Sequence, residues 1–269
     1  MFSERYGYIE KPLQIESMTD ALRNRIWNTY RAEIDIEPPI EITNYLQEIM
    51  DVFGLAFSGL GVNASKDLKA FQSWFMQADW YRIYDFVEVY LQFLPSVDRK
   101  TARDNLNSVL KAENAGYRII GNNVVPITNS SELTCIEQAE QTEYSSVNTH
   151  IQKAVELFSR KPTPDYENSI KESISAVEAM CGIITGLSGP NATLGKTIKK
   201  LKDCGIHIHP AMENAFSSLY GYTSDENGIR HGGIDFTNAP AEDAKYMLVS
   251  CSAFVNYLIE KWNKVNPTK

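Results

Sequence analysis

Hydrophobic residues recur at three- and four-residue spacing along most of the chain, which is the period of an amphipathic α-helix. Near the start, Leu22, Ile26 and Tyr30 form one such stripe, and Thr19 precedes it as a capping residue. Pro38-Pro39 interrupts the pattern, because the residue before a proline is pushed out of the helical conformation. The spacing predicts helices over residues 19–33, 41–53, 65–78, 80–94 and 99–114.

One short stretch has a strand pattern instead of a helical one. Residues 117–120 and 124–127 are rich in β-branched residues and flank Gly121-Asn122-Asn123, a composition typical of a hairpin turn. Two short strands do not form a domain alone. We therefore expect a small flap on the helical body, and the alternative is a recognition arm.

Helical spacing resumes after the hairpin. A boundary is expected at Lys161-Pro162-Thr163-Pro164, and the stripe through Ile170, Ile174 and Val177 is typical of bundle packing. The predicted fold is mainly α: a helical domain with a small hairpin over 1–128, a helical connector over 129–163, and a four-helix bundle over 164–269. The predicted helices of this half are 130–142, 145–159, 165–184, 193–204, 210–220 and about 240–265.

The net charge of −8, from 26 Lys+Arg and 34 Asp+Glu, argues against broad, non-specific binding to nucleic acid, and we expect no DNA partner. A local RNA contact through Lys196, Lys199, Lys200 and Lys202 is one interpretation, and a solvated helix face is the other. No basic leader and no membrane-length apolar run is present. We therefore expect a cytoplasmic protein with no membrane partner.

The sequence predicts no cofactor and no metal site. Gly189 and Gly195 enclose five residues where a phosphate-binding P-loop has four, and a helix precedes them where that motif needs a strand. His207 and His209 lie two apart without an evident set of further ligands. The cysteines are widely separated and form no C-x-x-C pair; they are Cys135, Cys181, Cys204 and Cys251.

The most informative polar segment is 221–233, which places Arg230 beside His231 between two helical stretches. An arginine binds phosphate through a planar fork of donors, and a histidine transfers protons near neutral pH. Both groups serve phosphodiester cleavage without a metal. The alternative is structural: Arg230 pairs with Asp225 or caps a helix, and His231 fills a turn before Gly232.

Four further residues are candidates for supporting this pair. Asn227 and Ser224 would contact phosphate or base, and Asp225 lies in the same segment. Glu178, beside the apolar stripe of helix 165–184, is a carboxylate that would orient a basic residue of the segment. Glu172 on the same helix is expected to face solvent.

The first thirty residues resemble a known family. Segments 2–8 and 14–28 are similar to the opening of the AbiJ N-terminal domain family, type 4, which occurs in bacterial abortive-infection (phage-defence) proteins. The C-terminal part resembles the HEPN superfamily of helical domains, many of which are RNases of toxin and phage-defence systems. The segments that carry this second resemblance are 168–179, 193–195, 209–211, 219–225 and 228–231.

The HEPN resemblance implies a HEPN-like four-helix bundle, a homodimer through that bundle, RNA as partner, and Arg230 and His231 as catalytic residues. The superfamily signature is an arginine, a polar residue, and a histidine after four to six intervening positions. Arg230 and His231 match its start, but Asp235, Phe236 and Thr237 stand where the second histidine is expected. The prediction is a phage-defence protein and candidate metal-independent endoribonuclease. The alternative is a catalytically inactive module that binds RNA or protein.

Overall fold

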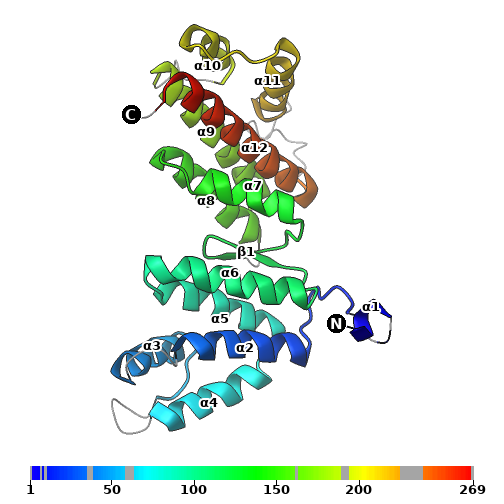
Figure 1. Ribbon diagram of the computed structural model, residues 1–269, viewed down its shortest axis with the longest axis vertical. Helices are drawn as coiled ribbons and strands as arrows, with labels where there is room; N and C mark the ends of the chain where they lie inside the picture. The colour runs from blue at the N-terminus through cyan, green and yellow to red at the C-terminus, as the bar shows by residue number, and fades with distance from the viewer. Residues whose placement is uncertain are drawn as a thin grey trace. The chain divides into compact units, whose positions relative to one another are not determined.

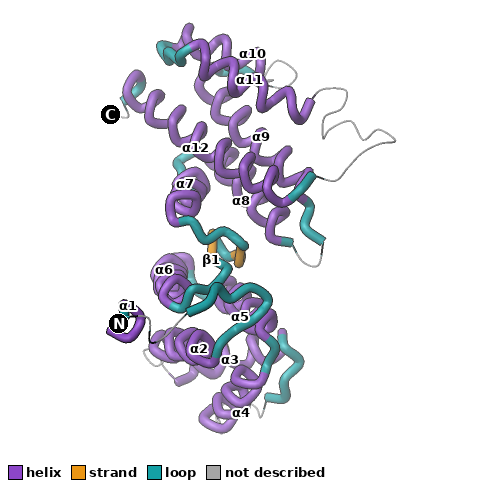
Figure 2. Tube along the Cα trace, turned by 90° about the vertical axis from the view of Figure 1, so that its right-hand side faces the viewer, coloured by secondary structure: helices purple, strands orange, loops and turns teal. Residues whose placement is uncertain are grey.

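The computed structural model describes residues 2–6, 8, 11–34, 39–57, 64–160, 163–188, 194–224 and 239–267. The chain divides into two compact units, Met1–Thr128 and Asn129–Lys269 (Figure 1). Helices make up most of both units, and the two strands are short (Figure 2). This confirms the mainly α class with a small hairpin.

The first unit contains six helices among its described residues. Five of them match the predicted helices to within a few residues. The exception is α1, which is too short to produce a periodic pattern. The helices are α1 (Phe2–Arg5), α2 (Asp20–Ile34), α3 (Pro39–Val52), α4 (Ala64–Gln77), α5 (Trp80–Phe93) and α6 (Ser96–Ala112).

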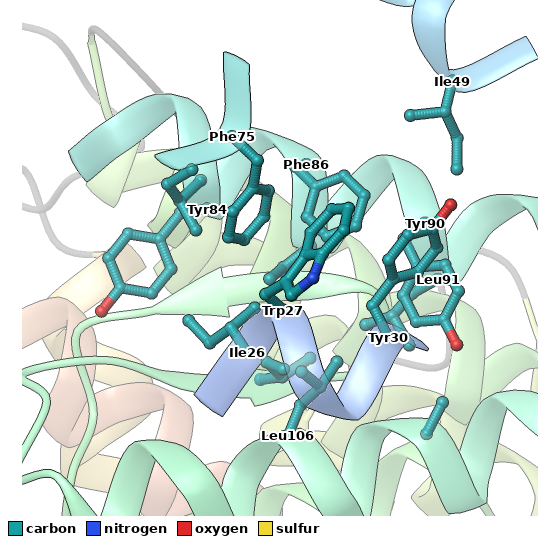
Figure 3. Packing of buried hydrophobic residues seen from close by; sticks show 14 of the residues in the cluster. Ile26, Trp27, Tyr30, Ile49, Phe75, Tyr84, Phe86, Tyr90, Leu91 and Leu106 are labelled. Carbon is teal, nitrogen blue, oxygen red and sulfur yellow. The ribbon is translucent and has the colours of Figure 1, made fainter. Parts of the chain in front are cut away.

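Aromatic side chains from α2, α4 and α5 fill the centre of this unit (Figure 3). Tyr30 meets Phe86 and Tyr90 edge to face, with ring centroids 5.1 Å and 5.2 Å away. Phe86 also contacts Phe71 and Phe75, at 5.5 Å and 5.2 Å. Burial raises the pKa of the Tyr30 hydroxyl, because the phenolate would have to lose its water. Edge-to-face pairs add to the free energy of apolar burial, so this cluster is the main stabilising feature of the unit.

The hairpin is part of this core. Strands β1 (Arg118–Ile120) and β2 (Asn123–Val125) pair antiparallel with Ile120 opposite Asn123, which leaves a two-residue turn. The predicted three-residue turn was therefore one residue too long. Asn107 of α6 donates to the Ile119 carbonyl at 2.9 Å and accepts from its N–H at 2.8 Å, and Ile119 is fully buried. These bonds bind the hairpin to the helices, as expected for a flap.

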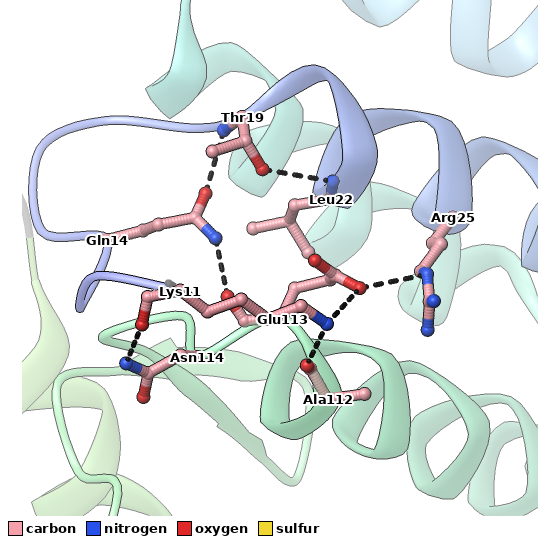
Figure 4. Close-up of polar contacts among 8 residues, drawn as sticks. All are labelled: Lys11, Gln14, Thr19, Leu22, Arg25, Ala112, Glu113 and Asn114. Carbon is pink, nitrogen blue, oxygen red and sulfur yellow. Dashed lines mark hydrogen bonds and ion pairs between the residues drawn. The ribbon is translucent and has the colours of Figure 1, made fainter. Parts of the chain in front are cut away.

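Residues 11–19 form a strap along the end of α6 (Figure 4). Gln14 donates its backbone N–H to the Asn114 carbonyl at 3.0 Å, and its own carbonyl accepts from Gly116 at 2.9 Å. A Cβ at position 116 would lie 2.9 Å from that Gln14 oxygen, so only glycine allows this approach. The Gln14 side chain donates to the Glu113 carbonyl and accepts from the Thr19 N–H. The strap thereby places the start of α2 beside the end of α6.

The second unit is a helical bundle formed by α7, α8, α9 and α12, with α10 and α11 packed against α9. Residues 129–163, expected to be a connector, supply two of these four helices. Periodicity identifies an apolar stripe but not its partner, and the stripe of α8 packs on α9. The elements are α7 (Ser130–Glu140), α8 (Ser145–Ser159), α9 (Tyr166–Thr185), α10 (Leu194–Lys200), the 3-10 helix η2 (Leu201–Cys204), α11 (Pro210–Ser224) and α12 (Ala241–Val265).

Across the described ranges, every helix is too short or too polar to cross a membrane.

Candidate functional site

The predicted catalytic pair lies in the segment that joins α11 to α12. Arg230 and His231, together with Asn227 and Asp225, fall within residues 225–238, outside the described residues. Ser224 is the last residue of α11. The roles assigned to these five residues therefore stay predictions, and what the structure provides is the pair of helices on either side.

Glu178 has a contact within the described part of the unit. It lies on α9, and its Oε1 accepts a hydrogen bond from the backbone N–H of Leu194 at 3.2 Å. Leu194 is the first residue of α10, so the carboxylate satisfies one of the N–H groups that a helix start leaves unpaired. Glu178 thus fixes the start of α10, and its support for the Arg230–His231 pair stays a prediction.

A groove of about 490 Å³ runs between α11 and α12, the two helices that segment 225–238 connects. Phe216 of α11 stacks on Phe254 of α12, with ring centroids 3.4 Å apart. The groove is mostly apolar, with Tyr246 58% exposed. Its lining residues are Ala215, Ser218, Leu219, Asp243, Tyr246 and Met247.

A histidine–carboxylate pair joins α8 to α9 in the same unit. His150 Nδ1 lies 2.6 Å from Glu172 Oε2, and both side chains are about one-third exposed or less. The expectation that Glu172 would simply face solvent was therefore wrong. The pairing depends on the register between two packed helices, which a single-sequence pattern does not contain. The contact fixes the direction of the ring.

Comparison with known protein families matches the first half of the chain. The family model of AbiJ N-terminal domain 4 covers residues 1–142. The chain belongs to this family. The matched region includes all of the first unit and extends through α7. Curated proteins and solved structures gave no match.

Membership in the AbiJ family indicates an abortive-infection protein, that is, a protein of phage defence. The matched residues include both segments in which the sequence resembles that family, 2–8 and 14–28. The match ends before α9, so the HEPN resemblance of the C-terminal part has no support from it.

Within the AbiJ-matched region, a buried carboxylate holds two cations. Only 4% of the Glu113 side chain is exposed, and its Oε1 lies 3.1 Å from Lys11 Nζ and 2.9 Å from Arg25 Nε (Figure 4). Lys11 also donates to the Ala112 carbonyl at 2.9 Å. A buried charge needs such partners, because its lost hydration is otherwise uncompensated. No sequence pattern pointed to this cluster, since Lys11 and Glu113 are about a hundred positions apart.

Two of the four cysteines, Cys181 and Cys251, are poorly suited to thiol chemistry. Cys181 and Cys251 are buried, and desolvation raises the pKa of each thiol to about 12. A thiol with that pKa carries almost no thiolate, the nucleophilic form, at neutral pH. In the described part of the chain, His, Cys, Asp and Glu side chains form no group of three or more with metal-binding geometry.

The lysines named in the sequence lie at one end of the second unit. Nearby, Lys261 of α12 donates to the His207 carbonyl at 3.4 Å and lies 5.5 Å from the Tyr257 ring centroid. Asp203 is an acidic neighbour in η2. RNA contact through the exposed lysines of α10 and η2 stays one of two interpretations. These lysines are Lys196, Lys199, Lys200 and Lys202.

Proposed function

We propose that this AbiJ-family protein acts in phage defence by cutting RNA, and that its second unit carries the cleavage site. The observation that carries the proposal is positional. The segment with Arg230 and His231 joins α11 to α12, and these helices flank a groove of about 490 Å³. The resemblance of this unit to HEPN domains, and the AbiJ membership of the first unit, support the same conclusion.

The chemistry is a transesterification within the RNA strand. The 2′-oxygen loses its proton to a base and attacks the adjacent phosphorus, the bond from phosphorus to the 5′-oxygen breaks, and that oxygen takes up a proton. Arg230 would stabilise the charge that develops on the phosphorane oxygens. His231 would act as one proton carrier. The products are a 2′,3′-cyclic phosphate and a 5′-hydroxyl.

A single histidine cannot stand on both sides of the phosphorus in an in-line displacement. We therefore place the second proton carrier on a second copy of the chain, in a two-fold dimer through the C-terminal bundle. The apolar groove between α11 and α12 is the surface proposed to meet its partner. Tyr246, which lines the groove, is 58% exposed, and Met212 of α11 is 39% exposed.

Tyr246→Glu is expected to weaken dimerisation at least tenfold, because it places a charge in the apolar contact. Sedimentation velocity over a range of protein concentrations measures the change. Val97→Glu is the control, since Val97 is 79% exposed and belongs to the first unit. A wild-type monomer at all concentrations, or equal dimerisation of Tyr246→Glu and wild type, contradicts the shared cleft.

The cleavage itself is tested by incubating purified full-length protein with a mixed RNA pool in EDTA. We expect the RNA to be cut at the same rate with and without the chelator, because no step uses a metal. Cleavage that stops in EDTA contradicts the mechanism. RNA that stays intact while the protein is folded and dimeric favours the alternative below.

The alternative is a non-catalytic module that binds RNA or a partner protein. The observation that favours it is the sequence after the pair: Asp235, Phe236 and Thr237 occupy the positions where the HEPN signature has its histidine. The net charge of −8 also opposes extensive contact with RNA. Binding of RNA without cleavage, unchanged in His231→Ala, would establish this reading.

A further inference from the structure

A second groove lies in the first unit, between α2 and α6, with a volume of about 480 Å³. This volume is within the range of small-molecule sites, about 300–1,000 Å³. Five of its seven lining residues have polar side chains, and Arg25 is the charged residue among them. Its lining residues are Arg25, Asn28, Thr29, Ala32, Asn105, Ser108 and Val109.

Arg25 is held in place from one side only. Its Nε pairs with the buried carboxylate of Glu113 at 2.9 Å, and Glu113 is in turn bound by Lys11. The two terminal nitrogens of Arg25 have no partner among the described residues, and Figure 4 shows them turned away from Glu113. Two cations and one carboxylate leave a net charge of +1 in this cluster. The guanidinium therefore presents donors to the groove at a fixed position, the arrangement that binds a phosphate group.

The hydroxyl groups of the groove offer hydrogen-bond acceptors, whereas Arg25 offers donors. Thr29 Oγ1 donates its proton to the Arg25 carbonyl at 3.0 Å, and Ser108 Oγ donates to the Asp104 carbonyl at 2.9 Å. With their protons used in this way, both oxygens can only accept hydrogen bonds from a ligand. The hydroxyl groups of a sugar can donate hydrogen bonds to these two oxygens. They do not favour a second anionic group.

We propose that this groove binds a sugar phosphate, either free or as part of a mononucleotide. Arg25 binds the phosphate, and the sugar hydroxyls donate to Thr29 and Ser108. The carboxamide of Asn28, with both donors and an acceptor, lies along the same groove. The proposal is independent of RNA cleavage, because every residue it uses belongs to the first unit.

Isothermal titration calorimetry of the full-length protein tests the site with four probes: ribose 5-phosphate, adenosine 5′-monophosphate, ribose and inorganic phosphate. We expect at least one of the two phosphorylated sugars to bind at least tenfold more tightly than ribose and than inorganic phosphate. Equal affinity for ribose 5-phosphate and adenosine 5′-monophosphate would show that the protein recognises the sugar phosphate and not the base. Tighter binding of the monophosphate adds a contribution from the base.

Three variants and a control assign the binding to this groove. Arg25→Ala removes the phosphate donor, Thr29→Val keeps the shape of the side chain but removes the acceptor, and Ser108→Tyr fills the groove. Arg25→Ala and Ser108→Tyr are each expected to weaken binding at least tenfold, and Thr29→Val about three-fold. Arg82→Ala, an exposed arginine of the same unit paired with Asp85, should leave it unchanged. Thr29→Val and Ser108→Tyr leave the Glu113 pair intact, so they remain informative if Arg25→Ala unfolds.

The proposal fails if neither phosphorylated sugar binds, if inorganic phosphate or ribose binds equally well, or if Thr29→Val and Ser108→Tyr bind like wild type.

Discussion

Phe86→Ala is expected to lower the free energy of unfolding of the first unit by about 3–5 kcal/mol. Phe86 is 1% exposed and contacts Tyr30, Phe71 and Phe75 from α2 and α4. Removing the ring deletes these contacts and leaves a cavity that rigid neighbouring rings cannot fill. The loss is large compared with the stability of a typical domain, about 5–15 kcal/mol.

Urea unfolding followed by tryptophan fluorescence measures this loss. Three of the four tryptophans, Trp27, Trp74 and Trp80, belong to the first unit, so the signal reports mainly on its unfolding. Tyr81→Ala is the matched control on the same helix, since Tyr81 is 49% exposed, and it should cost less than about 1 kcal/mol. A loss below about 1.5 kcal/mol for Phe86→Ala would mean that the aromatic cluster is not the main support of this unit.

Arg230→Ala is expected to reduce the rate of RNA cleavage in EDTA by about 10²- to 10³-fold, the usual cost of removing one group that stabilises transition-state charge. His231→Ala should reduce it at least as much, since it removes the proton carrier. The matched controls are Arg160→Ala, an exposed arginine in the second unit, and His209→Ala, whose Nδ1 accepts from the Ala211 N–H. Both controls should cut RNA at the wild-type rate.

If two copies of the chain share one cleft, mixing wild type with an inactive variant should lower the activity of the wild-type chains. Wild type mixed with an equal amount of the double variant Arg230→Ala/His231→Ala should lose about half its activity per wild-type chain after subunit exchange. Half of the wild-type chains are then paired with an inactive partner. Activity that stays proportional to the amount of wild type would show that each copy cuts RNA alone. Cleavage that persists in both single variants would show that other residues carry the reaction.

The longer helices were predictable from the sequence because they have a stripe of apolar residues and a recognisable start or end. Pro39 is the first residue of α3, and Asp165 accepts from the Asn168 N–H at 3.1 Å as the expected cap of α9. The hairpin was recognised by its composition, but its turn was given one residue too many. Asn123, a residue typical of turns, pairs with Ile120 in the ladder.

Contacts between distant segments were not predictable in the same way. The bundle of the second unit includes α7 and α8 because their stripes find partners on α9 and α12, and one sequence does not identify such partners. The pairing of His150 with Glu172 and the attachment of Arg25 to Glu113 depend on helix register and on the strap. Of the predicted site, Glu178 is described with a backbone partner, and Arg230 and His231 lie outside the described residues.

The most direct test of RNA cleavage by the second unit is the chemical identity of the ends that the purified protein produces in EDTA. Attack by the 2′-oxygen predicts fragments that end in a 2′,3′-cyclic phosphate and begin with a 5′-hydroxyl, and none of them in the Arg230→Ala reaction. Fragments with a 3′-hydroxyl and a 5′-phosphate would contradict the account, because attack by water on the phosphorus, and not by the neighbouring hydroxyl, produces those ends.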